Sequence, residues 1–149
     1  MPGLTALVVD ELVSFRESVC GMLHTTPCRV GSEPADRWDA VQMAKELQPD
    51  LILLGLGLPK LNGLETAKRL RTLAPQAKLL FLSQESSPDV VREALSLGAS
   101  GYIHKTNTSS DLLPAVEAVR GGEPFVSKSL EFSGRTDGSR RQRGTIRFT

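Results

Sequence analysis

Short runs of apolar residues alternate along this chain with segments whose apolar positions recur at helical spacing. A parallel sheet covered by crossover helices has this pattern, so the sequence predicts an α/β fold. The predicted strands are the following segments: Leu4–Val9, Arg29–Glu33, Leu51–Leu54, Lys78–Leu82 and Gly101–Ile103. The first predicted helix begins at a cap on Ser14. The other four run from about Arg37 to Leu47, from near Asn62 to before Pro75, from Ser87 to Gly98, and from about Ser109 to Arg120.

Local signals support several of these elements. The run Leu51–Leu54 is apolar throughout, as expected of a strand buried on both faces. The second strand is short and is followed by Pro34, so we expect it near an edge. Ser14 and Glu17 have capping-box spacing, and Pro88 stands at a favoured first helical position. Five strands, each followed by a helix, predict a flavodoxin-like (βα)₅ doubly wound sheet with strand order 2-1-3-4-5.

Polar and small residues follow four of the predicted strands. Right-handed crossovers bring the carboxyl ends of parallel strands to one edge of the sheet, so these loop residues should meet. They are Asp10 and Glu11, Gly55 with Gly57, Ser83, and Lys105. Two adjacent carboxylates repel each other unless a cation compensates their charge, and Mg²⁺ or a lysine ammonium can do so. Lys105 is the expected internal partner.

The composition is that of a soluble globular domain. The 149 residues are 40% hydrophobic and 23% charged, with a net charge of +1, so nothing global indicates nucleic acid or a membrane as partner. Cys20 and Cys28 form no CxxC motif and are expected to be reduced thiols. The apolar start of the chain ends at Asp10 with no basic segment before it, unlike a signal peptide, so we expect a cytoplasmic protein.

The last residues differ in composition from the rest. Residues 131–149 contain five arginines against Glu131 and Asp137, a local net charge of +3, and few apolar side chains. We therefore expect one domain over residues 1–130 and a basic, disordered tail over 131–149. Direct nucleic-acid binding by this tail is not expected, because a short basic tail is usually only solvated chain.

Several of these segments resemble response-regulator receiver domains. The matching motifs are Val8-Val9-Asp10-Glu11, Pro49-Asp50-Leu51-Ile52-Leu53-Leu54, Leu58-Pro59-Lys60-Leu61-Asn62-Gly63, Leu82-Ser83, and Gly98-Ala99-Ser100-Gly101-Tyr102-Ile103-His104-Lys105. The resemblance covers roughly residues 4–126, and the spacing of several independent motifs makes chance agreement improbable. It is greatest to receivers that precede a LuxR-type helix-turn-helix domain, although we expect no such domain after this one.

The resemblance implies a role for each loop residue. In that family, a histidine kinase phosphorylates an aspartate at the end of strand three, beside Mg²⁺ held by an acidic pair and a backbone carbonyl. The matching positions are Asp10 and Glu11 for the acidic pair, Gly57 for the carbonyl, Ser83 for the hydroxyl switch residue, Tyr102 for the aromatic switch and Lys105 for the phosphate-binding lysine. Gly55 stands at the phosphoacceptor position.

Glycine has no carboxylate to accept a phosphoryl group, so ordinary aspartyl phosphorylation should fail. Loss of that carboxylate also removes a metal ligand, so no cofactor is required and Mg²⁺ binding should be weak. Lys105 is then freer to pair with Asp10 or Glu11. We expect this internal ion pair to hold the pocket in one state.

The resulting hypothesis is a pseudo-receiver of two-component phosphorelay signalling that is not an enzyme. It would act by binding protein partners, including a second copy of itself, through helix four, strand five and helix five, within the region from Val90 to Arg120. The sequence does not identify a cognate kinase.

Alternatives remain at this stage. One is a conventional phosphorylation-dependent regulator that controls transcription through a partner or uses another acceptor such as Ser83. A less favoured one is a flavin- or nucleotide-binding protein of the same fold, because the first loop is acidic where a phosphate needs amides and hydroxyls. Gly55 could also serve a turn that requires positive φ, and Asp10 with Glu11 could be a solvated helix-entry pair.

Overall fold

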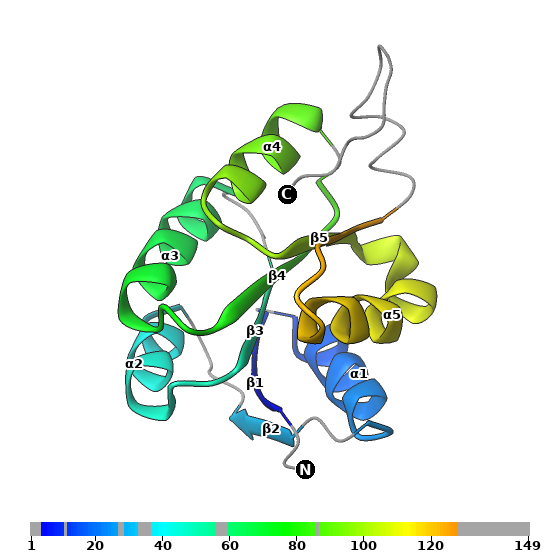
Figure 1. The fold of residues 1–149 in the computed structure, drawn as a ribbon, viewed down its shortest axis with the longest axis horizontal. Helices are drawn as coiled ribbons and strands as arrows, with labels where there is room; N and C mark the ends of the chain where they lie inside the picture. The colour runs from blue at the N-terminus through cyan, green and yellow to red at the C-terminus, as the bar shows by residue number, and fades with distance from the viewer. Residues whose placement is uncertain are drawn as a thin grey trace.

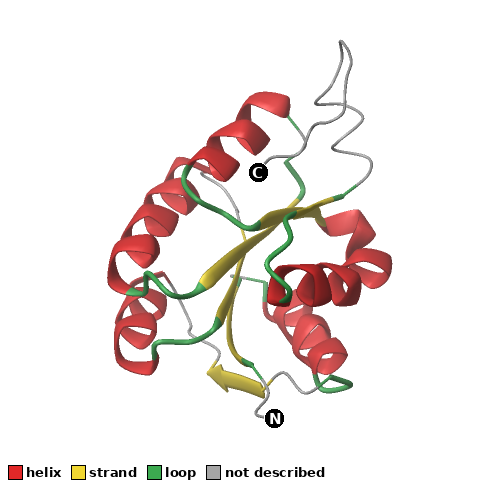
Figure 2. Ribbon diagram, viewed as in Figure 1, coloured by secondary structure: helices red, strands yellow, loops and turns green. Residues whose placement is uncertain are grey.

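The fold is a single parallel sheet with helices on both of its faces. The computed structural model describes residues 4–10, 12–26, 29–32, 37–55, 60–85 and 87–127. The predicted tail over residues 131–149 lies outside them. Figure 1 shows helices α1 and α5 on one side of the sheet and α2, α3 and α4 on the other, and Figure 2 shows the same layers coloured by secondary structure.

The sheet contains six strands in the order β2-β1-β3-β4-β5-β6, and every neighbouring pair is parallel. The strands are β1 (Thr5–Val9), β2 (Arg29–Ser32), β3 (Leu51–Gly55), β4 (Lys78–Ser83), β5 (Gly101–His104) and β6 (Phe125–Val126). The helices are α1 (Val13–Leu23), α2 (Arg37–Leu47), α3 (Lys60–Leu73), α4 (Pro88–Ser96), the short 3₁₀ turn η1 (Lys105–Asn107) and α5 (Thr108–Arg120). The predicted order 2-1-3-4-5 is confirmed, with β2 at one edge and an additional strand at the other.

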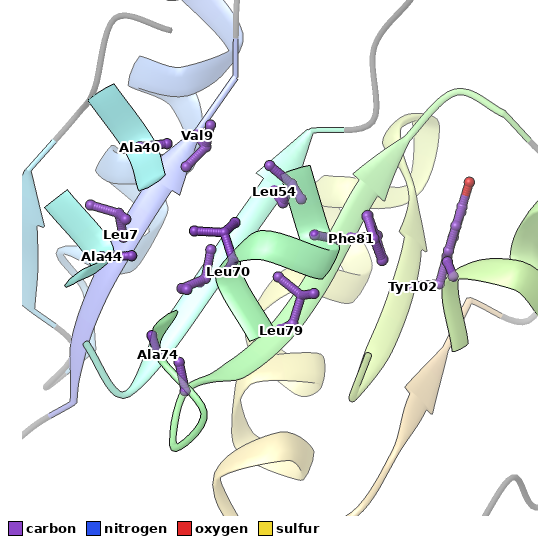
Figure 3. Close-up of a cluster of buried hydrophobic side chains, with 14 of the residues drawn as sticks. Leu7, Val9, Ala40, Ala44, Leu54, Leu70, Ala74, Leu79, Phe81 and Tyr102 are labelled. Carbon is purple, nitrogen blue, oxygen red and sulfur yellow. The ribbon is translucent and has the colours of Figure 1, made fainter. Parts of the chain in front are cut away.

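Side chains of alternate strand residues point to opposite faces of the sheet and form two buried clusters. Figure 3 shows part of the cluster under α2, α3 and α4, to which the strands contribute Leu7, Leu54, Leu79, Phe81 and Tyr102. The cluster under α1 and α5 takes the residues between them, among them Val8, Leu53, Leu80 and Ile103. The apolar run Leu51–Leu54 is therefore buried on both faces, as predicted.

One predicted helix start is wrong. Ser14 lies inside α1, and the N-cap residue is Leu12, which has no side-chain capping bond. The Asp10 carboxylate instead accepts a hydrogen bond from the backbone N–H of Leu12 itself at 2.9 Å, which fixes the chain just before the helix. Helix α3 begins at Lys60, close to the start predicted near Asn62. The predicted start of α4 at Ser87 and Pro88 is confirmed.

Strand β6 was not predicted. It contains two residues, too few for an alternating pattern to be recognised, and it follows α5 after a turn at Gly121 and Gly122. Its backbone pairs with β5: Phe125 N donates to Ser100 O at 3.2 Å and Ser127 N donates to Tyr102 O at 3.0 Å.

In the part of the chain that the structure describes, no helix is long and apolar enough to cross a lipid bilayer.

The double burial of β3 gives a stability prediction. Leu53 is 0% exposed, so Leu53→Ala should lower the free energy of unfolding by about 2–5 kcal/mol through lost burial and the cavity left behind. Leu47→Ala is the control, because Leu47 is 41% exposed at the end of α2 and its truncation should cost under about 1 kcal/mol. Urea unfolding followed by circular dichroism measures both, and equal losses would contradict the assignment of the core.

Candidate functional site

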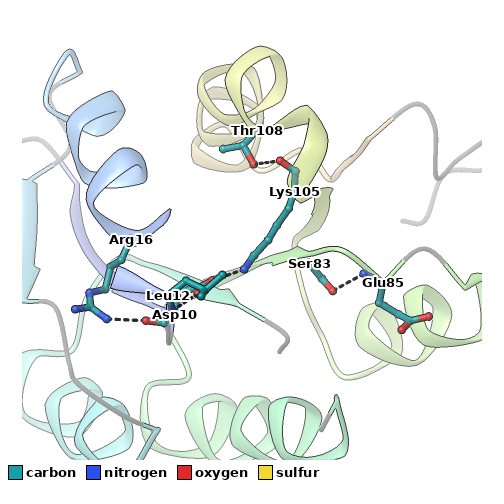
Figure 4. A network of polar contacts seen from close by, with 7 residues as sticks. All are labelled: Asp10, Leu12, Arg16, Ser83, Glu85, Lys105 and Thr108. Atoms are coloured by element: carbon teal, nitrogen blue, oxygen red, sulfur yellow. Dashed lines mark hydrogen bonds and ion pairs between the residues drawn. The ribbon is translucent and has the colours of Figure 1, made fainter. Parts of the chain in front are cut away.

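The carboxyl edge of the sheet contains a largely buried ion pair between Asp10 and Lys105. Asp10 directly follows β1 and Lys105 directly follows β5, and Nζ of the lysine lies 2.8 Å from Oδ2 of the aspartate (Figure 4). The side chains are only 5% and 12% exposed, respectively. Burial weakens screening by water and salt, so this contact matters more than an ion pair at the surface.

Asp10 is also fixed by two backbone-directed contacts to the start of α1. Its Oδ1 accepts the hydrogen bond from Leu12 N, and its carbonyl oxygen accepts one from Arg16 Nη1 at 2.6 Å. Oδ2 is buried and has no aligned hydrogen-bond donor among the described residues. The nearby Lys105 ammonium therefore compensates the charge on this oxygen as an ion pair, without the directionality of a hydrogen bond.

Phe15 and Thr108 help to position Lys105. The Lys105 Nζ atom lies 4.3 Å from the centre of the Phe15 ring, within the range of a cation–π contact. The hydroxyl of Thr108 donates to the Lys105 carbonyl at 2.7 Å, which fixes the backbone at the start of η1 (Figure 4). The sequence does not predict this contact, because the helical spacing of Phe15 marks it as an inward-facing residue and does not tell which side chain reaches the lysine.

Gly55 is the last residue of β3 and lies beside Asp10. A Cβ atom built on Gly55 would overlap Oδ2 of Asp10 and lie 2.8 Å from its Cγ. The glycine is not required by a left-handed backbone, because the positive-φ glycines of the described chain are Gly98 and Gly122. What the glycine provides is space, which the Asp10 carboxylate fills.

A second group of polar contacts joins the ends of β4 and β5. Ser83 is fully buried, and its Oγ accepts a hydrogen bond from Glu85 N at 2.9 Å. The hydroxyl of Tyr102 donates to Glu85 O at 3.0 Å, and the tyrosine ring is fully buried with its centre 5.8 Å from that of Phe81. Burial raises the pKa of Tyr102 to about 12; a hydrogen bond with Ser83 opposes this shift, and the charge of Glu85 adds to it.

The structure thus brings Asp10, Gly55 and Lys105 together in one cluster, with Ser83 and Tyr102 at the same edge of the sheet. Glu11 and Gly57, the other predicted pocket residues, lie outside the described residues. His104, which immediately precedes Lys105, is half-buried, and its Nδ1 lies 2.7 Å from Thr106 Oγ1.

The described residues do not fit a Mg²⁺ ion. Oδ2 of Asp10 faces the Lys105 ammonium, and position 55 offers no side chain. Mg²⁺ requires several oxygen ligands in near-octahedral geometry, and no three His, Cys, Asp or Glu side chains converge on one point within the described ranges.

A doubly wound parallel sheet with an acid, a lysine, a buried hydroxyl and a buried tyrosine at its carboxyl edge defines a receiver-type signalling domain. Residues 6–117 match the family model of the response regulator receiver domain, and the chain belongs to this family.

Comparison with individual proteins agrees with this. The chain is 33% identical over 127 residues to the nitrate/nitrite response regulator protein NarL of Escherichia coli K12, which covers 85% of this chain and 59% of NarL. It is 30% identical over 115 residues to protein CcdB of Bacillus subtilis, covering 77% of this chain and 96% of CcdB. The crystal structure of a LuxR-family two-component response regulator from Aurantimonas sp. SI85-9A1 superposes with a TM-score of 0.82 at 25% identity, covering 89% of this chain and 95% of that one.

Most of the similar curated proteins are longer than the region they share with this chain. The chain spans 59% of NarL, 43% of the transcriptional activator protein ExaE of Pseudomonas putida and 51% of the transcriptional regulatory protein DegU of Brevibacillus brevis. The similarity therefore concerns the receiver part of these regulators.

The buried ion pair gives the first prediction for this site. Lys105→Met keeps the aliphatic stem but leaves Asp10 as a buried carboxylate without its counter-charge, so the free energy of unfolding should fall by about 2–4 kcal/mol. Lys68→Met is the matched control, since the Lys68–Glu65 pair is more than half exposed at 4.0 Å and should contribute below about 0.5 kcal/mol. Equal losses of the free energy of unfolding, measured in urea, would show that the Asp10–Lys105 contact contributes no more to stability than the exposed Lys68–Glu65 pair.

Tyr102 gives the second prediction, because it is the sole tyrosine of the chain and tyrosinate absorbance therefore reports it alone. Its pKa is 10.0 when exposed and about 12 in the fold. The folded state keeps the proton to higher pH, so this contribution to stability is complete below pH 10 and is lost as pH rises towards about 12. A titration midpoint near 10 in protein that is still folded by circular dichroism would contradict the burial of the hydroxyl, and the same titration in urea gives the reference.

Proposed function

We propose that this chain is a pseudo-receiver that takes part in two-component signalling by binding other proteins, without aspartyl phosphorylation at position 55. The observation that carries the proposal is the overlap between the Asp10 carboxylate and the space that a side chain at position 55 would need. At the position where the family has its acceptor, the chain has glycine, and the neighbouring acid fills the vacated volume.

The ion pair supports a pocket held in one arrangement. A phosphoryl group or a divalent cation entering the pocket would have to compete for Lys105 or for Asp10, which are bound to each other at 2.8 Å. Separating them leaves a buried charge without its counter-charge on each side, which is energetically costly. The proposed pocket therefore has little affinity for Mg²⁺ and does not need phosphate to neutralise Lys105.

Ser83 is a poor alternative acceptor. Its hydroxyl is fully buried, and its Oγ already accepts the Glu85 N–H. A neutral hydroxyl also needs an adjacent base to attack phosphorus. The conventional phosphorylation-dependent regulator thus has less support than the pseudo-receiver, although relatives such as DegU and ExaE carry the names of transcriptional regulators. The match to the receiver family likewise favours signalling over flavin binding.

The proposed partner surface is the face made by α4, β5 and α5. Strand β6 lies along the outer edge of β5, so the edge of this face is formed by β6 rather than by β5 itself. Arg92 and Glu93 are exposed on the outside of α4, whereas Val91 and Ala94 pack inward. We propose that a protein partner, including a second copy of this chain, binds here whether or not a kinase is active.

Phosphotransfer tests the proposal. The unmodified chain, incubated with acetyl phosphate and Mg²⁺, should show no phosphoryl adduct in its intact mass. Gly55→Asp should gain one, because a carboxylate oxygen can form the new O–P bond while acetate leaves, once Asp10 has rotated away from position 55. Gly55→Asn is the control, since it displaces Asp10 in the same way and offers no carboxylate.

Two outcomes would count against the proposal. A Mg²⁺-dependent adduct on the unmodified chain would overturn it, and peptide mapping would then identify the acceptor. If neither the unmodified chain nor Gly55→Asp is modified, the expectation that a carboxylate at position 55 is enough for phosphotransfer is wrong.

A further inference from the structure

Strand β6 returns along the outer edge of β5 after α5 has ended. The chain turns at Gly121 and Gly122, and Gly122 has a φ of +86°. The new strand then runs parallel to β5, with Gly101 facing Phe125 and Tyr102 facing Val126. The approach is close, because a Cβ on Gly101 would lie 2.5 Å from the Phe125 carbonyl oxygen. Gly101 thus permits the two backbones to pack together.

Ser127, the residue after β6, fastens the strand to two other elements. Its Oγ donates to Asp111 Oδ2 in the first turn of α5 at 2.7 Å and accepts a hydrogen bond from His104 N at 3.1 Å. The side chain is fully buried. A buried hydroxyl bonded to a carboxylate is a charge-assisted contact and among the stronger hydrogen bonds in proteins. This Ser127–Asp111 contact is the latch of β6.

The latch lies beside Tyr102. Ser127 N donates to the Tyr102 carbonyl, and Val126, the pairing partner of Tyr102, belongs to the same buried cluster as the tyrosine ring. His104, whose backbone N–H donates to Ser127 Oγ, immediately precedes Lys105. Strand β6 therefore contacts the backbone between the buried tyrosine and the pocket lysine.

We propose that β6 is a conformational strap: while Ser127 is latched to Asp111, Tyr102 is held in its buried position, and release of β6 frees Tyr102 to leave it. A strand of two residues contributes few backbone hydrogen bonds, so it opens more easily than the central strands. Opening removes Val126 from the cluster around the tyrosine and frees the Tyr102 carbonyl. This coupling does not depend on any modification at Gly55. It therefore goes beyond the pseudo-receiver proposal and can be tested separately from it.

The test uses the full chain and two readouts. Hydrogen exchange measures the opening of β6, through the amides of Phe125 and Ser127. Acetylation of the sole tyrosine by N-acetylimidazole, located by peptide mapping and reversed by hydroxylamine, measures exposure of the Tyr102 hydroxyl. Ser127→Ala removes the latch hydroxyl, and Asp111→Asn weakens the same contact with little change of shape. Ser96→Ala is the control, because its hydroxyl bonds only to the Glu93 carbonyl on the exposed side of α4 in the described structure.

Loss of a hydrogen bond to a charged acceptor should raise the open fraction about tenfold, so both latch variants should show amide exchange and tyrosine acetylation about tenfold faster than the parent. Ser96→Ala should match the parent in both measurements. If exchange at β6 accelerates while acetylation stays at the parent rate, the burial of Tyr102 does not depend on the strap and the proposal is wrong. It is equally wrong if neither rate changes, since the latch then does not hold β6. Should Ser127→Ala fail to fold, Asp111→Asn decides.

Discussion

The Asp10–Lys105 ion pair joins the ends of β1 and β5 at the carboxyl edge of the sheet. A carboxylate that is only 5% exposed needs a counter-charge, and parallel topology brings Lys105 from the end of β5 to supply it. Several other features follow from this need. The backbone N–H of Leu12, just before α1, donates to the other oxygen of the same carboxylate. The Phe15 ring lies against the Lys105 ammonium, and position 55 must leave room for the aspartate side chain.

The elements that could be predicted from sequence are those with a strong local signal. The run Leu51–Leu54 marks a doubly buried strand, and proline and serine mark the start of α4. Strand β6 could not be found, because two residues have no period and its existence depends on Gly101 permitting close approach. The cap predicted at Ser14 failed because the helix already begins at Val13, where Arg16 N donates to the Leu12 carbonyl, and the Asp10 carboxylate binds the Leu12 N–H just before it.

For the site, topology alone brought Asp10, Ser83 and Lys105 to one edge, because the carboxyl ends of parallel strands meet there. Side-chain direction could not be predicted in this way. That the lysine reaches Asp10 over Phe15, and that Ser83 and Tyr102 meet through the backbone of Glu85, depends on rotamers chosen by packing. The aromatic contact has no sequence signal beyond the helical spacing that marks Phe15 as a core residue.

Gly55 matters for the packing of Asp10. The Asp10 carboxylate and a side chain at position 55 compete for the same volume, so in this arrangement one excludes the other. The ion pair with Lys105 uses the Asp10 oxygen that a Cβ at position 55 would overlap. A carboxylate introduced at position 55 would meet this oxygen, and it could be accommodated only after Asp10 had been displaced from its counter-charge.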